Sequence, residues 1–304
     1  MPAHRRYPTL ATLAMLCLAL APTSGFPQQG EEEEPIHDNS FLIEEAYNQE
    51  PGVVQHIYNL VPAWEHGRNA QRTVDFLFVQ EWPVFSQRHQ FSYSLPLRRI
   101  DGVPDVGVGS DASGLGDIML NYRYQLLDGS NEALPLACAP RASLILPSGD
   151  ANLGLGNGKL GYQFNLPLSY QVKKWFFHFN AGLTKTDGVT AGLDPDQPFI
   201  GHTLDGYNLG GSAIYCLRPH FNLMLETVAL WDEELLPNGR EEPGFQAILL
   251  PGFRWAPYTE GETQWVLGCG VPIGLSPDAP DVGVFFYMSF EHRYVRTPRW
   301  DKAD

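Results

Sequence analysis

The chain has 304 residues, a formal net charge of −15 and 43% hydrophobic residues. So acidic a chain lacks the basic face that binding to nucleic-acid phosphates requires, which excludes nucleic acid as a partner. It also has no uncharged apolar run of about 18 residues, which excludes a membrane protein built from helices.

The first apolar stretch of the chain has the features of an export signal. Basic residues at 4–6 (HRR) precede an apolar stretch over 10–21, and the small residues TSG follow. A positive start, a short apolar middle and small residues at the cleavage site are typical of a secretory signal peptide. We therefore predict a signal peptide over 1–25, cleaved after Ser24 or Gly25.

The residues after the predicted signal are expected to form an acidic leader over 26–52. Four consecutive glutamates occupy 31–34, and such a run is typical of a solvated segment rather than a metal site. Residues 40–50 (SFLIEEAYNQE) could form a short helix before the first strand. This helix could cap or plug the periplasmic mouth of the domain that follows.

From residue 53 onward the dominant pattern is alternation with a period of two. In 117–126 (DIMLNYRYQL), apolar residues at even positions face away from polar residues such as Asn121 and Arg123, because successive strand side chains point to opposite faces. We predict about a dozen strands in these ranges: 53–61, 72–82, 88–97, 117–126, 135–147, 159–172, 175–184, 207–217, 221–231, 245–256, 264–275 and 284–294.

Two architectures use many alternating strands, a soluble sandwich and a transmembrane barrel. The predicted strands are as long as a membrane crossing requires. Their connections alternate between short ones, such as 172–174, and long polar ones, such as 186–206, which is typical of outer-membrane barrels. We therefore predict an all-β fold, a transmembrane antiparallel up-and-down barrel of about 12 strands over 53–295, with a C-terminal tail over 296–304.

Each face of the predicted strands has its own function in a barrel. Aromatic side chains near strand ends of the apolar face are expected to form interfacial girdles, namely Trp82, Tyr124, Tyr170, Trp175, Tyr207, Trp231, Trp255, Trp265 and Tyr294. The polar face is expected to line the lumen, with these candidates: Asp117, Asn121, Arg123, Arg141, Gln163, Asn165, His178, Asn180, Glu226, Arg254, Glu291 and Arg293. Their charges could fill a narrow lumen as structural pairs or line a solute path. We favour pairing as the main role.

The motifs of catalysis and metal binding are weak. His202 lies near Thr203 and Asp205 (GHTLDGYN), but no serine stands two residues after the histidine and no GxSxG motif occurs, so an outer-membrane hydrolase is a minor alternative. The mature cysteines, an odd and widely spaced set, form neither a disulfide framework nor a zinc motif. We predict no enzyme activity, no cofactor and no metal.

Five stretches resemble a known outer-membrane family, named for the MetA pathway of phenol degradation. They are FLIEEAYNQEPGVVQH (41–56), QEWPVFSQRHQ (80–90), GLGDIMLNYRY (114–124), QWVLGCGVPIGL (264–275) and GVFFYMSFEHRY (283–294). The resemblance implies an outer-membrane barrel that transports small compounds, aromatic ones among them, and it assigns no functional residue.

Together, these features predict a bacterial outer-membrane barrel in contact with lipid, through which a small solute of unknown identity passes. The alternative is a barrel that transports nothing and supports the envelope or presents its loops. The sequence predicts no oligomeric state.

Overall fold

The computed structural model describes residues 36, 38–65, 71–101, 111–131, 134–189, 201–235, 240–261 and 263–295. The predicted signal peptide, the glutamate run at 31–34 and the tail over 296–304 lie outside the described residues. Within them, no helix is long and apolar enough to cross a membrane.

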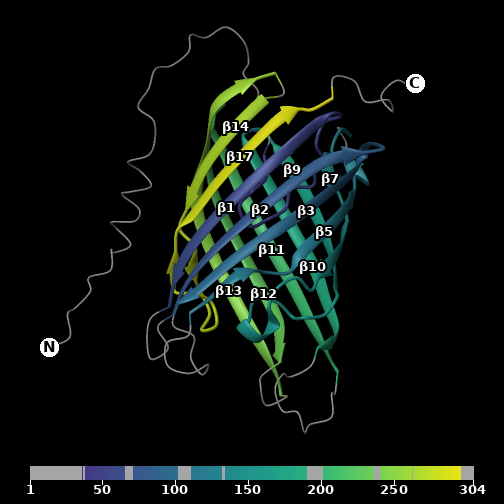
Figure 1. Ribbon diagram of the computed structural model, residues 1–304. Helices are drawn as coiled ribbons and strands as arrows, with labels where there is room; N and C mark the ends of the chain where they lie inside the picture. Colours follow the sequence, from purple (N-terminus) through teal and green to yellow (C-terminus); the bar gives the residue numbers. More distant parts are fainter. Residues whose placement is uncertain are drawn as a thin grey trace, which may run out of the picture.

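The strands form one sheet that closes on itself, so the predicted antiparallel barrel of 12 strands is confirmed (Figure 1). Some barrel strands are interrupted and consist of two segments. The segments are β1 (Val53–Trp64), β2 (Arg72–Val84), β3 (Ser86–Asp101), β4 (Ala112–Leu115), β5 (Ile118–Tyr124), β6 (Leu127–Asp128), β7 (Leu136–Cys138), β8 (Arg141–Leu146), β9 (Gly161–Val172), β10 (Trp175–Val189), β11 (His202–Arg218), β12 (Phe221–Leu235), β13 (Glu241–Glu260), β14 (Thr263–Gly270), β15 (Ile273–Gly274), β16 (Val282–Gly283) and β17 (Phe285–Arg293).

Closure occurs where the first strand meets the last. β1 lies between β2 and β17, and Ile57 is paired with Val79 on one side and with Ser289 on the other (Figure 1). Both pairings are antiparallel. A closed sheet leaves no edge strand with unpaired N–H and C=O groups, which is what a lipid environment requires.

The two faces of the barrel wall differ as the alternation predicts. On β10, Phe177 and Phe179 are 40% and 43% exposed, whereas His178 and Asn180 between and beside them are 3% and 4% exposed. The large apolar side chains therefore stand on the outside, and the polar ones point inward. A sandwich would bury the apolar rows between two layers, so that alternative is wrong.

Most connections at one end of the barrel are tight turns, and the longer connection there, between β5 and β8, contains the β6–β7 hairpin. β9 and β10 are joined by Lys173 and Lys174, and Lys173 has a positive φ of 54°. Phe85, between β2 and β3, also has a positive φ, of 65°. At the opposite end, the connection between β8 and β9 is long and includes a 3-10 turn over Ala151–Leu153. We call these the short-turn end and the long-connection end.

The helix predicted over 40–50 is wrong. Residues 38–50 contain only bends and irregular chain. This segment lies inside the barrel, where side chains of the wall hydrogen-bond to its backbone. A helix would need the same N–H groups for its own carbonyl groups, and the wall supplies other partners.

Candidate functional site

The lumen is occupied by the chain's own segment 38–50, which we call the plug segment. Six of its backbone N–H groups donate to side chains of the wall. The pairs are Phe41 and Leu42 to Glu226, Glu44 to Asn180, Ala46 to Ser169, Asn48 to Gln125, and Gln49 to Gln90. The partners come from strands around the barrel. The plug segment is therefore held in one path by the wall, without secondary structure of its own.

One anchor of the plug segment is Phe41. Its N–H donates to Oε1 of Glu226 at 2.9 Å, and the next N–H, of Leu42, donates to Oε2 at 2.7 Å. The Phe41 ring stacks on Phe285 with ring centroids 5.1 Å apart. On the wall behind the ring, a Cβ at Gly268 would lie 2.6 Å from ring carbons of Phe41. The ring therefore fills a slot that exists only because the wall carries glycine there.

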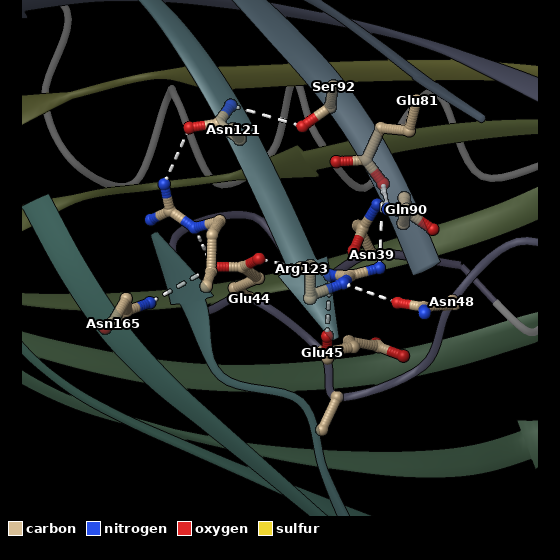
Figure 2. Close-up of polar contacts among 12 residues, drawn as sticks. Asn39, Glu44, Glu45, Asn48, Glu81, Gln90, Ser92, Asn121, Arg123 and Asn165 are labelled. Carbon is tan, nitrogen blue, oxygen red and sulfur yellow. Dashed lines mark hydrogen bonds and ion pairs between the residues drawn. The ribbon is translucent and has the colours of Figure 1, made fainter. Parts of the chain in front are cut away.

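A second anchor is Glu44, which meets two arginines and is shown with Arg123 and Asn165 in Figure 2. Its carboxylate accepts from Arg141 Nε at 2.8 Å and from Arg123 Nη1 at 3.1 Å. Asn165 donates to the same carboxylate at 3.1 Å. Burial raises the pKa of the Glu44 carboxyl, but Arg141 and Arg123 outweigh it and the net pKa lies below its usual value. This carboxylate is charged in the plugged state and neutralises two lumen cations.

The N-terminal end of the plug segment is held through Arg254 and Asp38. Arg254 is 1% exposed and donates to the backbone carbonyls of Asp38, Asn39 and Ile36. The Asp38 carboxylate accepts from the Tyr287 hydroxyl at 2.7 Å. Burial raises the pKa of Asp38 to about 6, although Arg254 and the hydroxyl donors act in the opposite direction. Asp38 is therefore a group of the plug segment that titrates near neutral pH.

Glu45 links the plug segment to a buried histidine. Its Oε1 lies 3.4 Å from Nε2 of His178 and 3.3 Å from Nη1 of Arg254. The other ring nitrogen of His178 is 2.7 Å from Ser169 Oγ. The order serine, histidine, carboxylate is that of a hydrolytic triad, but all three side chains are buried and Ser169 also accepts the N–H of Ala46. The arrangement therefore holds the plug segment and offers no access to a substrate.

The C-terminal end of the plug segment is fixed near the short-turn end. Asn48 accepts from Arg123 Nε at 2.9 Å, a contact visible in Figure 2. Gln49 donates to Gln55 at 2.6 Å and its N–H donates to Gln90 at 2.7 Å. The network thus continues without a break from the Glu44 pairs to the start of β1.

Two cavities reach the plug segment from opposite ends of the barrel. The outer cavity, of about 790 Å³, opens toward the long-connection end and has Leu42 at its floor. The inner cavity, of about 750 Å³, opens toward the short-turn end and is lined by Tyr47 and Asn48. Residues 42–48 therefore separate two water-accessible spaces.

Most of the lumen candidates named from the sequence contact the plug segment or the residues flanking it. Arg123, Arg141, Asn165, His178, Asn180, Glu226, Arg254 and Glu291 do so through side-chain contacts, and Arg293 donates to the carbonyl of Pro51. Asn121 and Gln163 lie one step away, because both accept from Arg141. Asp117 lies elsewhere. It accepts the N–H groups of Gly149 and Asn157 and thus shapes the β8–β9 connection.

Several residues of the site were not predicted. Gln90, Gln125 and Ser169 hold the plug segment. Gln125 and Ser169 share the parity of the predicted Arg123 and Asn165 beside them, so the alternation could have found both, whereas the strand of Gln90 carried no predicted lumen residue. The inward face is also less polar than parity suggested. Ile214, Leu250, Val266 and others pack there around Phe41, in a buried apolar cluster.

The motifs weighed for catalysis are engaged in other contacts. His202 Nδ1 lies 2.8 Å from Oε1 of Glu241, and the hydroxyl of Thr203 donates to Asp187. Across the part of the chain that the structure describes, no three His, Cys, Asp or Glu side chains gather as metal ligands, and Cys138, Cys216 and Cys269 are free thiols.

The closed wall, its apolar exterior and its polar interior define the class of outer-membrane β-barrels. The crystal structure of the COG4313 outer membrane channel from Pseudomonas putida F1 is similar, with a TM-score of 0.59 and 13% identity, over 81% of this chain and 97% of that one. The transport unit of the autotransporter AIDA-I from Escherichia coli matches with a TM-score of 0.46 and 10% identity, over 84% and 94%. No protein family and no curated protein matches by sequence. At these identities the likeness concerns the fold.

Proposed function

We propose that this protein is an outer-membrane channel for small solutes, and that the plug segment closes it. The observation that carries the proposal is the pair of cavities of about 790 and 750 Å³ that approach residues 42–48 from the two ends of the barrel. Both spaces end at the plug segment, which lies between them. Movement of the plug segment alone would join them into one path.

The orientation follows from the lengths of the connections. In outer-membrane barrels the short turns face the periplasm and the long connections face outward. By that rule the outer cavity opens to the cell exterior, and both ends of the barrel domain lie on the periplasmic side. Export by a signal peptide over 1–25 agrees with this orientation, because both ends of the barrel domain then lie on the periplasmic side.

The residues that line the outer cavity indicate which class of solute enters it. Its rim carries the carboxylates of Glu65, Asp75, Asp111, Glu234 and Asp278, and Arg98, the cation of this lining, pairs with Asp75. Its deeper lining, Leu42, Val61, Ile248 and Phe285, is apolar. We propose that neutral or cationic solutes with an apolar or aromatic body enter, and that anions are disfavoured. Membership of the family named for the MetA pathway of phenol degradation would agree with this class.

The experiment compares the full chain with a variant that lacks 36–50, each reconstituted in planar bilayers. We expect the deletion to raise single-channel conductance at least about tenfold, because the barrier is the segment itself. Equal, near-zero conductance of both proteins, each shown to be a folded barrel by heat-modifiable gel migration, would reject the channel. Flux of benzyl alcohol above that of benzoate, measured with the deletion variant in vesicles, tests the solute class.

The second candidate is a barrel that transports nothing and stabilises the envelope. The dense contacts of Glu44, Glu45 and Arg254 in the lumen favour it, because they stabilise the closed state. The same experiment separates the two functions, since a purely structural barrel would gain no selective flux when the segment is removed.

A further inference from the structure

Two neighbouring turns at the short-turn end concentrate positive charge. Lys173 and Lys174 form the turn between β9 and β10, and Arg218 ends β11 just before the next turn. The two connections lie side by side, because the N–H of Cys216 donates to the carbonyl of Lys174 at 2.8 Å. Lys173, Lys174 and Arg218 are all exposed. We call these three residues the basic turns.

Elsewhere at the same end the charges are acidic or mixed. The β6–β7 hairpin has Asp128 near Arg88 at the start of β3, and the β13–β14 turn has Glu260 beside Tyr258. The positive charge of the basic turns is therefore a local feature of one side of the barrel. It is not a uniform property of this end.

Aromatic side chains stand directly above the basic turns on the outer face. Trp175 and Phe177 are stacked, with ring centroids 5.9 Å apart and an interplanar angle of 8°. Trp175 also contacts Tyr215 on β11, with centroids 4.9 Å apart. Tryptophan and tyrosine collect where lipid headgroups meet acyl chains, so these rings mark the depth of that boundary.

From the rings, a row of small outward residues continues along β11 between larger apolar side chains of β10 and β12, and we call this row the groove. The outward residues there are small, Ala213 and Gly211, and they are paired with Phe177 and Phe179 of β10. On the other side, Leu225 of β12 is paired with Ala213 and is 50% exposed. The floor is open, because a Cβ at Gly211 would meet its nearest atom at 3.8 Å.

The groove is long enough for part of one acyl chain. Gly211 lies four positions from Tyr215, which corresponds to about 13 Å of strand. A chain lying in the groove would contact the flanks of Phe177, Phe179 and Leu225, and its polar end would reach the level of the basic turns. Each basic side chain near a negatively charged lipid surface strengthens binding by electrostatic attraction.

We propose that the basic turns and the groove along β11 form a binding site for an anionic phospholipid of the periplasmic leaflet, with phosphatidylglycerol as the chemical type. The cations bind the headgroup phosphate, and Ala213 and Gly211 seat one acyl chain. The site rests on the orientation given under the proposed function, because it requires the short-turn end to face the phospholipid leaflet.

The test counts lipids that remain bound to the delipidated full chain in detergent, by native mass spectrometry during titration with phosphatidylglycerol. We expect the variant K173Q/K174Q/R218Q to lose affinity about tenfold or more. The matched control K159Q/K185Q/R240Q removes the same charge from exposed residues at the long-connection end, and we expect it to bind as the wild type does. A second variant, Gly211→Leu, keeps the charges and fills the groove, and should also weaken binding.

Three results would overturn the proposal: unchanged binding by K173Q/K174Q/R218Q, an equal loss in the control, or equal affinity for phosphatidylcholine. The last result would mean nonspecific contact with lipid. The readout is independent of conductance. A barrel that binds phosphatidylglycerol at this site but carries no current refutes the channel alone, and a conducting barrel without the site refutes the lipid proposal alone.

Discussion

On β10, two faces of one strand follow different physical rules. Phe177 and Phe179 on the outside contact a few apolar neighbours and are otherwise exposed. His178 and Asn180 on the inside each have a particular partner in the plug segment or the wall. The outer face needs only to be apolar and large, so its residues are interchangeable. The inner face needs donors and acceptors at given positions, because its side chains form the hydrogen bonds that the plug segment does not form within itself.

The largest expected effect comes from removing a charge on the inner side. Glu44→Ala leaves Arg123 and Arg141 in the lumen without their carboxylate. Breaking a buried ion pair by removing one partner costs about 3–5 kcal/mol. We expect this loss to destabilise the bound position of the plug segment. Amide hydrogen exchange of residues 41–49 and bilayer conductance should both increase.

Glu44→Gln is the control for that prediction. It keeps the shape and one acceptor oxygen, so the plug segment should loosen less than in Glu44→Ala. If both variants exchange and conduct as the wild type does, the Glu44 pairs do not hold the plug segment.

An intermediate effect is expected from a charge on the outer side. Phe179→Arg places a cation on the lipid-facing surface, which costs about 2–4 kcal/mol near the bilayer midplane. We expect lower barrel stability in urea unfolding and unchanged conductance of the folded fraction. Phe179→Leu should be nearly neutral. A conductance change in the arginine variant, at equal folding, would show that the two faces are not independent.

The smallest effect concerns pH and Asp38. The pKa of Asp38 is raised from 3.8 to about 6. Protonated Asp38 therefore stabilises the bound position of the plug segment. This stabilisation is fully present below the ordinary pKa of 3.8 and is lost as the pH rises through about 6. Residual conductance should therefore fall between about pH 7 and about pH 5. In Asp38→Asn, which resembles the protonated acid, this part of the pH dependence should vanish. An identical pH profile in both proteins would assign it to other groups.

The same contrast explains what could be predicted from the sequence. A period of two is a local pattern, and burial on one face enforces it, so the strands and their closure followed from residues such as those of 117–126. The outer aromatic rows followed for the same reason. The inward Gln125 and Ser169 obey the same parity, and they became important only through the segment that they hold.

The conformation of the plug segment could not be predicted from its own residues. Residues 40–50 contain good helix formers, and local propensity alone favours a helix. The lumen overrides that preference, because Glu226, Asn180, Ser169 and Gln125 accept the N–H groups that a helix would pair internally. These partners are separated from the segment by many residues in sequence, and no local pattern reveals them.

The central claim, that movement of the plug segment opens the path, is tested most directly by locking the segment in place. The N–H of Ala46 lies 2.8 Å from Ser169 Oγ, so Ala46→Cys with Ser169→Cys can form a disulfide between segment and wall. The lock is built on Glu44→Ala, with Cys138, Cys216 and Cys269 replaced by alanine. We expect the oxidised protein to conduct little and dithiothreitol to restore the current. Equal conductance before and after reduction, with the disulfide verified by mass spectrometry, would contradict the account.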